Sequence, residues 1–145
     1  MSVEFFTRHE TTLNQALAAA HARGYWSPFS EMPSPRVYGE TANDDAKSSF
    51  DAQRGKSFSG LNAGTDTLAV TEVSPFDGAL GISYPKSSVD SLIASSTEAW
   101  KDWRRAGPRT WVGVSLEILH RLNRASFDIA YAVQHTTGQG FMMAF

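Results

Sequence analysis

The sequence contains no cysteine among its 145 residues. This absence excludes disulfide bonds, thiolate metal sites and a cysteine nucleophile within the chain. The first ten residues lack a basic segment followed by a long apolar stretch, so we expect no secretory signal. No apolar run approaches the roughly 20 residues that a membrane-spanning helix needs. We therefore expect a cytoplasmic protein with no membrane partner.

The sequence also lacks an excess of either charge. Thirteen basic and fifteen acidic residues give a net charge of -2, and the basic residues are scattered. The densest basic cluster comprises Lys101, Arg104 and Arg105 and lies beside Trp100 and Trp103. Tryptophan rings among basic residues can stack nucleic-acid bases. Because no wider basic surface surrounds the cluster, we predict no nucleic-acid partner and expect both tryptophans to face the interior.

What is present indicates a folded protein of ordinary composition. Hydrophobic residues make up 41% of the sequence, aromatic residues 12% and charged residues 19%. A chain of this length and composition matches one compact domain with a core of its own. We expect an α+β fold that is mainly helical with a small β-hairpin, with a helical and loop region over residues 1–67 and a hairpin followed by helices over residues 68–145.

The pattern over residues 1–67 predicts helices and loops. Ser2 is expected to cap a helix that runs to residue 23 and ends at Gly24. Prolines 28, 33 and 35 predict an extended connection over residues 25–40, with a polyproline-type ligand as the alternative. A helix over residues 43–54 should be buried through Ala46 and Phe50 and end at Gly55. In the following loop, the spacing of Gly60, Gly64 and Thr65 fits neither a P-loop nor the dinucleotide-binding fingerprint.

The pattern over residues 68–145 predicts a hairpin and then helices. Alternating apolar residues at 68–84 flank an Asp-Gly turn, and Pro85 should close the second strand. Ser87 and Asp90 match a capping box, which predicts a helix ended by Gly107-Pro108. The apolar face of that helix is predicted to comprise Val89, Leu92, Ile93, Ala99, Trp100 and Trp103. The next helix should carry Val112, Leu116, Leu119 and Leu122 on one side, and a kink or a new helix near residues 123–126 should continue to Gly138.

The last residues form an apolar run without a polar terminus: Phe141, Met142, Met143, Ala144 and Phe145. Such a run is expected either to pack against a partner chain or to continue into further sequence. We therefore predict a partner surface at Phe141, Met142, Met143 and Phe145.

Residues capable of chemistry do not form a recognisable site. His9 and His21 are too far apart for one metal on a single turn, and His120 and His135 lack a carboxylate three or four residues further on. All four are interpreted as surface or boundary histidines. Asp44 and Asp45 fit a helix N-terminus, Glu72 is isolated, and no serine lies in a nucleophile elbow. We accordingly predict no catalytic, cofactor-binding or metal-binding residue in this chain.

Five segments nevertheless resemble the aldehyde dehydrogenase superfamily, and within it the PaaN-like group of phenylacetic acid degradation. They are GYWSPF at 24–29, TEVSPF at 71–76, ALGISYP at 79–85, LEIL at 116–119 and HTTGQGFMMAF at 135–145. The likeness to the PaaN-like group covers nearly the whole chain, and that to the superfamily in general begins at about Val70. The sequence departs from the wider family at residues 136–139, where TTGQ replaces a charged turn, and at Trp111, where an arginine is often expected.

The resemblance implies the leading portion of an aldehyde dehydrogenase-like α/β fold. The full-length enzyme would oxidise an aldehyde with NAD or NADP through a cysteine thiohemiacetal, with a glutamate assisting hydrolysis, and would be a homo-oligomer. In the family those groups lie downstream, so the resemblance assigns none of them to a residue here. The chain is expected to be inactive alone and to need the remainder of the enzyme. The alternative is a standalone helical protein-interaction module.

Overall fold

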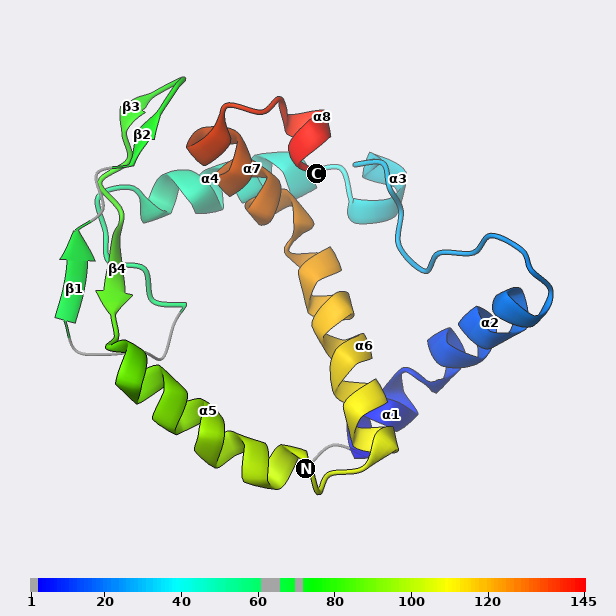
Figure 1. Ribbon diagram of the computed structural model, residues 1–145. Coiled ribbons are helices and arrows are strands. Elements are labelled where there is room, and N and C mark those ends of the chain that lie inside the picture. The colour runs from blue at the N-terminus through cyan, green and yellow to red at the C-terminus, as the bar shows by residue number, and fades with distance from the viewer. Residues whose placement is uncertain (1–2, 61–65, 70–71) are drawn as a thin grey trace. The chain divides into compact units, whose positions relative to one another are not determined.

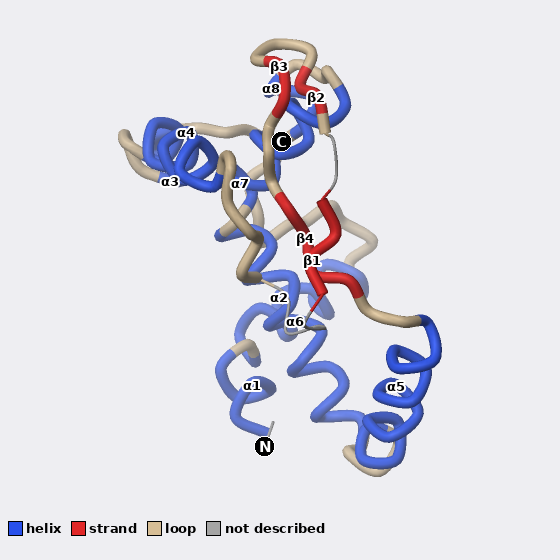
Figure 2. The backbone as a smooth tube through the Cα atoms, turned by 90° about the vertical axis from the view of Figure 1, so that its left-hand side faces the viewer, coloured by secondary structure: helices blue, strands red, loops and turns tan. Residues whose placement is uncertain are grey.

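The computed structural model describes residues 3–60, 66–69 and 72–145, and the side chains of 66–69 lie outside this description. The chain forms two compact units. Unit 1 comprises Met1–Glu31 and Thr97–Ala125, and unit 2 comprises Met32–Ser96 and Ser126–Phe145. Figure 1 labels the elements, and Figure 2 shows their types. The predicted fold class, mainly helical with a small antiparallel hairpin, is confirmed. The boundary expected at residue 67 stays a prediction.

Unit 1 is built on a close contact between two helices. They are α1 (Val3–Arg8) and α6 (Pro108–Arg124), which lie side by side in Figure 1. A Cβ atom at Gly113 of α6 would lie 2.4 Å from the backbone nitrogen of Phe6 and 2.9 Å from its Cα. Glycine is therefore required for the two backbones to approach this closely.

The helix expected over residues 2–23 is broken. His9 separates α1 from α2 (Glu10–His21), and the predicted cap Ser2 lies outside the described residues. At the end of α2, Arg23 adopts the left-handed conformation that we assigned to Gly24, with φ 51°. The Gly24 N–H then donates to the Ala19 carbonyl at 2.9 Å, which satisfies a terminal helix carbonyl.

The predicted apolar faces of the next two helices are wrong. No residue of α5 (Val89–Trp103) is buried, and Trp100 and Trp103 are 57% and 38% exposed instead of facing the interior. In α6, Val112 and Leu116 of the predicted face are partly buried and Leu119 and Leu122 are about half exposed, whereas the face that meets α1 contributes the buried residues Thr110, Gly113 and Glu117. Close packing on Gly113 decided which face is covered, and apolar periodicity did not.

Unit 2 has the apolar core that the sequence predicted for residues 43–54. Helix α4 (Ala42–Gln53) buries Ala46 and Phe50, ends before Gly55 (φ 69°), and packs against α7 (Ser126–Thr137). The buried apolar cluster comprises Ala46, Phe50, Leu80, Ile82, Phe127 and Tyr131. Residues 35–38, expected to be extended, form a short helix, α3 (Pro35–Tyr38), because proline is tolerated at the first helical position.

The hairpin of unit 2 consists of two antiparallel ladders, drawn in red in Figure 2. In the outer ladder β1 (Asp66–Ala69) pairs with β4 (Ser83–Lys86), and next to the turn β2 (Val73–Ser74) pairs with β3 (Gly78–Ala79). Gly78 has φ 74° in the predicted turn. Pro85 does not close the second strand, because β4 continues to Lys86. Each strand of a two-stranded sheet has one free edge, where a missing N–H is tolerated. Gly64 and Thr65 of the preceding loop lie outside the described residues.

The ends of α5, α6 and α7 follow the sequence signals with one shift. Ser88, not Ser87, caps α5, because its hydroxyl accepts the Ser91 N–H at 3.1 Å. Pro108 begins α6 directly after Gly107, whose φ is 82°. The break near residues 123–126 is a new helix, α7, which ends at Gly138 with φ 79°.

The final apolar run forms a short helix, α8 (Phe141–Ala144), that is only partly exposed. Phe141 and Phe145 pack against the apolar cluster, with ring centroids 5.8 Å and 5.0 Å from that of Phe127. Met142 and Met143 remain 59% and 80% exposed. Two aromatic side chains of the predicted partner surface are thus covered by this chain itself.

Candidate functional site

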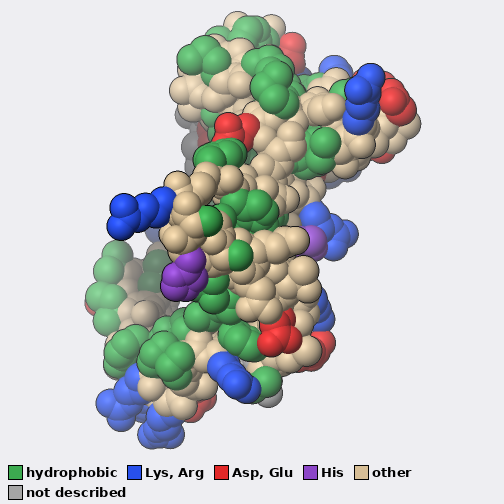
Figure 3. Space-filling view, turned by 90° about the vertical axis from the view of Figure 1, so that its right-hand side faces the viewer, with side chains coloured by type: hydrophobic (Ala, Val, Ile, Leu, Met, Phe, Trp, Pro, Cys, Tyr) green, Lys and Arg blue, Asp and Glu red, His purple; other side chains and the backbone are tan. Residues whose placement is uncertain are grey.

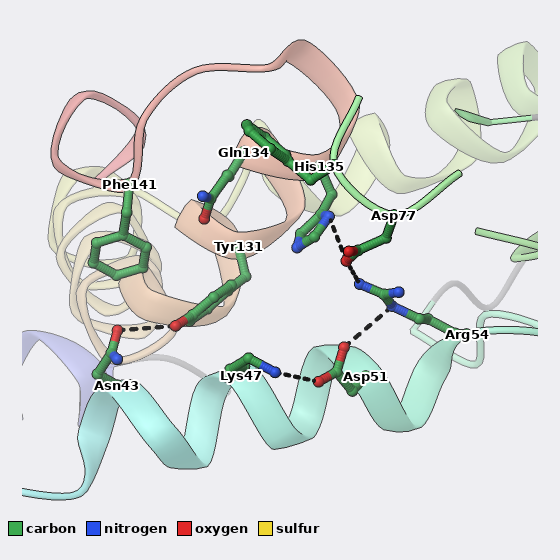
Figure 4. A pocket seen from close by; sticks show the side chains of 10 residues that line it. Asn43, Lys47, Asp51, Arg54, Asp77, Tyr131, Gln134, His135 and Phe141 are labelled. Carbon is green, nitrogen blue, oxygen red and sulfur yellow. Dashed lines mark hydrogen bonds and ion pairs between the residues drawn. The ribbon is translucent and has the colours of Figure 1, made fainter. Parts of the chain in front are cut away.

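A polar hollow of about 550 Å³ lies within unit 2, between α4, α7, α8 and the hairpin turn. Figure 4 shows polar side chains from these elements converging on it. Its volume is in the range of small-molecule sites. The lining residues are Asn43, Lys47, Asp51, Arg54, Phe76, Asp77, Tyr131, Gln134, His135 and Phe141.

His135 is the most buried titratable group at this hollow, with 8% of its surface exposed. Its ring stacks on Phe50 at a centroid distance of 4.6 Å and meets the edge of Phe76 at 6.0 Å. Helix α7 supplies the histidine, α4 supplies Phe50, and the hairpin turn supplies Phe76. Packing of three elements that are distant in sequence therefore fixes the orientation of the imidazole.

The hydrogen bonds of Ser74 determine which nitrogen of His135 carries the proton. The Ser74 hydroxyl oxygen accepts the N–H groups of Phe76 and Asp77, at 3.1 and 3.3 Å. It lies 2.9 Å from Nδ1 of His135. Because both acceptor positions of the oxygen are used, the hydroxyl hydrogen is left to donate to Nδ1. The neutral imidazole then carries its hydrogen on Nε2.

The neutral state of His135 is favoured by its surroundings. Burial, and then the positive charge of Arg54, lower the pKa of His135 below its ordinary value of 6.5. The Asp77 carboxylate lies 3.6 Å from Nδ1, beyond hydrogen-bond distance, and acts in the opposite direction. At neutral pH the imidazole is therefore uncharged and fixed in one tautomer.

A chain of ion pairs forms one wall of the hollow, as the dashed lines of Figure 4 show. Lys47 Nζ lies 2.8 Å from Asp51, Arg54 Nε lies 3.1 Å from the same carboxylate, and Arg54 also pairs with Asp77. Hydrogen bonding from Lys47 lowers the pKa of Asp51, and hydrogen bonding from Arg54 lowers the pKa of Asp77. Both carboxylates therefore stay ionised and engaged with cations.

The facing wall is partly aromatic. The Tyr131 hydroxyl donates to the Asn43 side-chain oxygen at 3.1 Å, which joins α7 to α4. The Phe141 ring lies 5.1 Å from that of Tyr131, and Gln134 lies beside them (Figure 4). The hollow thus combines hydrogen-bonding groups with apolar ring surface.

The arrangement is not a nucleophilic triad. Ser74 and Asp77 both approach the same nitrogen of His135, whereas a triad needs the base to contact the serine and the carboxylate through different nitrogens. Ser74 is also held by the turn N–H groups. The geometry can bind and orient a ligand, but it does not activate this serine.

A second polar cluster lies in unit 1 around Glu117, which is 7% exposed. Its carboxylate lies 2.7 Å from Nε2 of His9, 2.9 Å from Nε of Arg121 and 3.3 Å from Arg8. The hydrogen bond with His9, and next the hydrogen bond with Arg121, lower the pKa of Glu117 to about 2. The cluster joins the break between α1 and α2 to α6.

The interpretation of all four histidines as surface or boundary residues is wrong for two of them. His9 and His135 are buried, whereas His21 is exposed and His120 is partly exposed. The carboxylates that approach the buried pair come from distant sequence, which spacing on one helix cannot reveal. Of the acidic residues considered, Asp44 and Asp45 lie in the first turn of α4 as expected, and Glu72 accepts the Tyr84 hydroxyl.

Two kinds of site are not found among the described residues. Within 3–60, 66–69 and 72–145, no three histidine, aspartate or glutamate side chains gather closely enough to hold a metal ion. Over the same described residues, no helix has the length and apolar character needed to cross a membrane.

Comparison with known proteins gives one informative likeness. No family model matches the chain, and no curated protein matches it. A crystal structure of an NAD-dependent aldehyde dehydrogenase from Burkholderia multivorans is similar, with 57% sequence identity over 99% of this chain and a TM-score of 0.86. The chain spans 26% of the length of that protein. The fold thus matches a part of an aldehyde dehydrogenase, and the likeness supports that superfamily.

Proposed function

We propose that this chain is the leading, non-catalytic portion of an NAD(P)-dependent aldehyde dehydrogenase of the PaaN-like group, a cytoplasmic homo-oligomer of aromatic acid catabolism. The observation that supports the proposal is the 57% identity, over 99% of the chain, to a dehydrogenase of which the chain spans 26%. The PaaN-like assignment rests on the five sequence segments that resemble that group.

The contribution of the chain to the reaction is structural under this proposal. Aldehyde oxidation of the kind that the resemblance implies needs a cysteine thiolate, and this sequence has none. The thiolate, the cofactor contacts and the hydrolytic glutamate would come from the rest of the enzyme. Unit 1 and unit 2 would provide a folded support for that part.

Exposed apolar side chains agree with a supporting role. Five apolar residues of α5 are more than one-third exposed, and Met142 and Met143 of α8 are exposed further along the chain. Figure 3 shows hydrophobic side chains at the surface on one side of the molecule. Apolar surface of this extent is normally covered. The α5 residues are Val89, Leu92, Ile93, Trp100 and Trp103.

The same exposure favours the second candidate, a standalone helical interaction module. The two candidates differ in what covers α5, because the first requires the remaining part of a dehydrogenase and the second a separate partner protein. An antibody raised against this chain distinguishes them when it is used to isolate the native protein. We expect a polypeptide much longer than 145 residues that reduces NAD or NADP with an aromatic aldehyde. A 145-residue polypeptide in stoichiometric complex with another protein, without this activity, would overturn the proposal.

A further inference from the structure

The hollow beside His135 presents hydrogen-bond donors for which no acceptor is found in the part of the chain that the structure describes. Nδ1 of His135 accepts the Ser74 hydroxyl hydrogen, so Nε2 carries a hydrogen. In Figure 4 this second ring nitrogen points into the hollow. The His135 side chain is only 10% exposed, and no hydrogen bond from its Nε2 to the described residues is found. Nε2 opens onto the hollow, so an acceptor bound there can take its hydrogen.

Two neighbouring side chains add donors on the same side. Asn43 uses its oxygen to accept from Tyr131, which leaves its amide N–H groups available. Lys47 gives one ammonium hydrogen to Asp51 and has two more. Both residues lie on α4 one helical turn apart, so they face the hollow together.

Three side chains that line the hollow already use an acceptor oxygen, whereas Gln134 offers both an oxygen and an N–H group. Asp51 is paired with Lys47 and Arg54, Asp77 is paired with Arg54, and the Asn43 oxygen is bonded to Tyr131. The hydrogens of His135 Nε2, Asn43 and Lys47 that remain for a ligand lie on one side of the hollow, so the group that complements them there is an acceptor. A carboxylate, which takes one hydrogen bond or more at each oxygen and is attracted to an ammonium group, meets this requirement.

The remaining lining residues indicate that the rest of the ligand is apolar. The rings of Phe76, Tyr131 and Phe141 supply apolar surface beside the donors. We propose that the hollow is a binding site for a small carboxylic acid with an apolar body, its carboxylate bonded to His135 Nε2, Asn43 and Lys47. Unit 2 alone forms this site, and the inference does not depend on the dehydrogenase assignment.

The test is a titration of the full chain with benzoate, followed by NMR of the histidine ring nitrogens and by calorimetry. We expect saturable binding that shifts the Nε2 resonance of His135 more than that of His21, which is exposed. Benzyl alcohol, the neutral control, should bind at least tenfold more weakly, because hydrogen bonds to a charged group are the stronger ones. Equal binding of the two probes, or no binding of benzoate, would overturn the proposal.

Two variants locate the site. Lys47→Met should weaken benzoate binding about tenfold, the loss expected for one charge-assisted hydrogen bond. Lys56→Met is the matched control, since Lys56 is exposed and does not line the hollow, and it should leave the affinity unchanged. Far-ultraviolet circular dichroism confirms that each variant is folded. Benzoate binding that Lys47→Met leaves intact, or a His135 resonance that does not respond, would place the ligand elsewhere and contradict the assignment.

Discussion

The imidazole Nε2 of His9 lies 2.7 Å from the Glu117 carboxylate, although 108 positions separate the two residues. The bond connects the junction of α1 and α2 to the buried face of α6. Arg8 and Arg121 approach the same carboxylate, so its negative charge is compensated from both helices. Unit 1 is held at this point by a polar cluster and a close backbone contact, with few buried apolar side chains.

The stability of unit 1 should fall at acidic pH, because Glu117 becomes protonated. Hydrogen bonding, from His9 first and then from Arg121, lowers its pKa from 4.5 to about 2 in the folded protein. A depressed carboxyl pKa stabilises the fold above the unfolded value and loses that contribution as the pH falls from 4.5 towards 2. Tryptophan fluorescence during urea unfolding reports on unit 1, because all four tryptophans lie there. Glu117→Gln should flatten the dependence of stability on pH in this window, and the exposed Glu10→Gln should not.

The close contact of α1 with α6 predicts an intolerant glycine. In Gly113→Ala the new Cβ would meet the backbone of Phe6, which cannot move as a side chain tip can. We expect a loss of about 1–3 kcal/mol, the usual cost of overpacking. Gly24→Ala is the control, since a Cβ there meets nothing within 4 Å. Equal unfolding temperatures for the two variants would show that the contact is looser than described.

The core of unit 2 should depend on Phe50. This side chain is 5% exposed and stacks on His135, so Phe50→Ala removes both apolar burial and the support of the imidazole. The expected loss is about 3 kcal/mol or more in chemical unfolding. Phe76→Ala deletes the same group from a residue that is 56% exposed, and it should cost clearly less. A similar loss for both would contradict the position of the core.

Substitution of two adjacent serines, one at a time, tests the N-cap of α5. Only Ser88 places its hydroxyl on the Ser91 N–H, so Ser88→Ala should cost about 1 kcal/mol, whereas Ser87→Ala should cost little. Hydrogen exchange of the Ser91 amide gives the most local measurement. Faster exchange in Ser87→Ala than in Ser88→Ala would show that Ser87 caps the helix, as the sequence predicted.

Local patterns predicted the helix ends better than the buried faces. Gly55, Gly107-Pro108 and Gly138 end or begin helices as expected, because their conformational requirements are set by neighbouring residues alone. The faces of α5 and α6 were wrong, since burial depends on which element arrives from elsewhere in the chain. Gly113 gives the only local hint of the α1 contact, and a single glycine in a helix is a weak signal.

The candidate site was missed for the same reason. His135, Ser74 and Asp77 are brought together by the packing of α7 on the hairpin turn, and no spacing on one element connects them. His9 and Glu117 are 108 positions apart in the sequence. One signal was available, because both histidines sit close to element ends with aromatic residues nearby, but it does not identify their partners.

The most direct test of the central claim is aldehyde-dependent NADH formation by the protein isolated with an antibody against this chain, before and after treatment with iodoacetamide. Because the 145 residues contain no cysteine, the proposal predicts activity that alkylation abolishes, and no activity from the 145-residue chain alone. Turnover by the isolated chain, or by an antibody-purified protein that iodoacetamide leaves fully active, would contradict it.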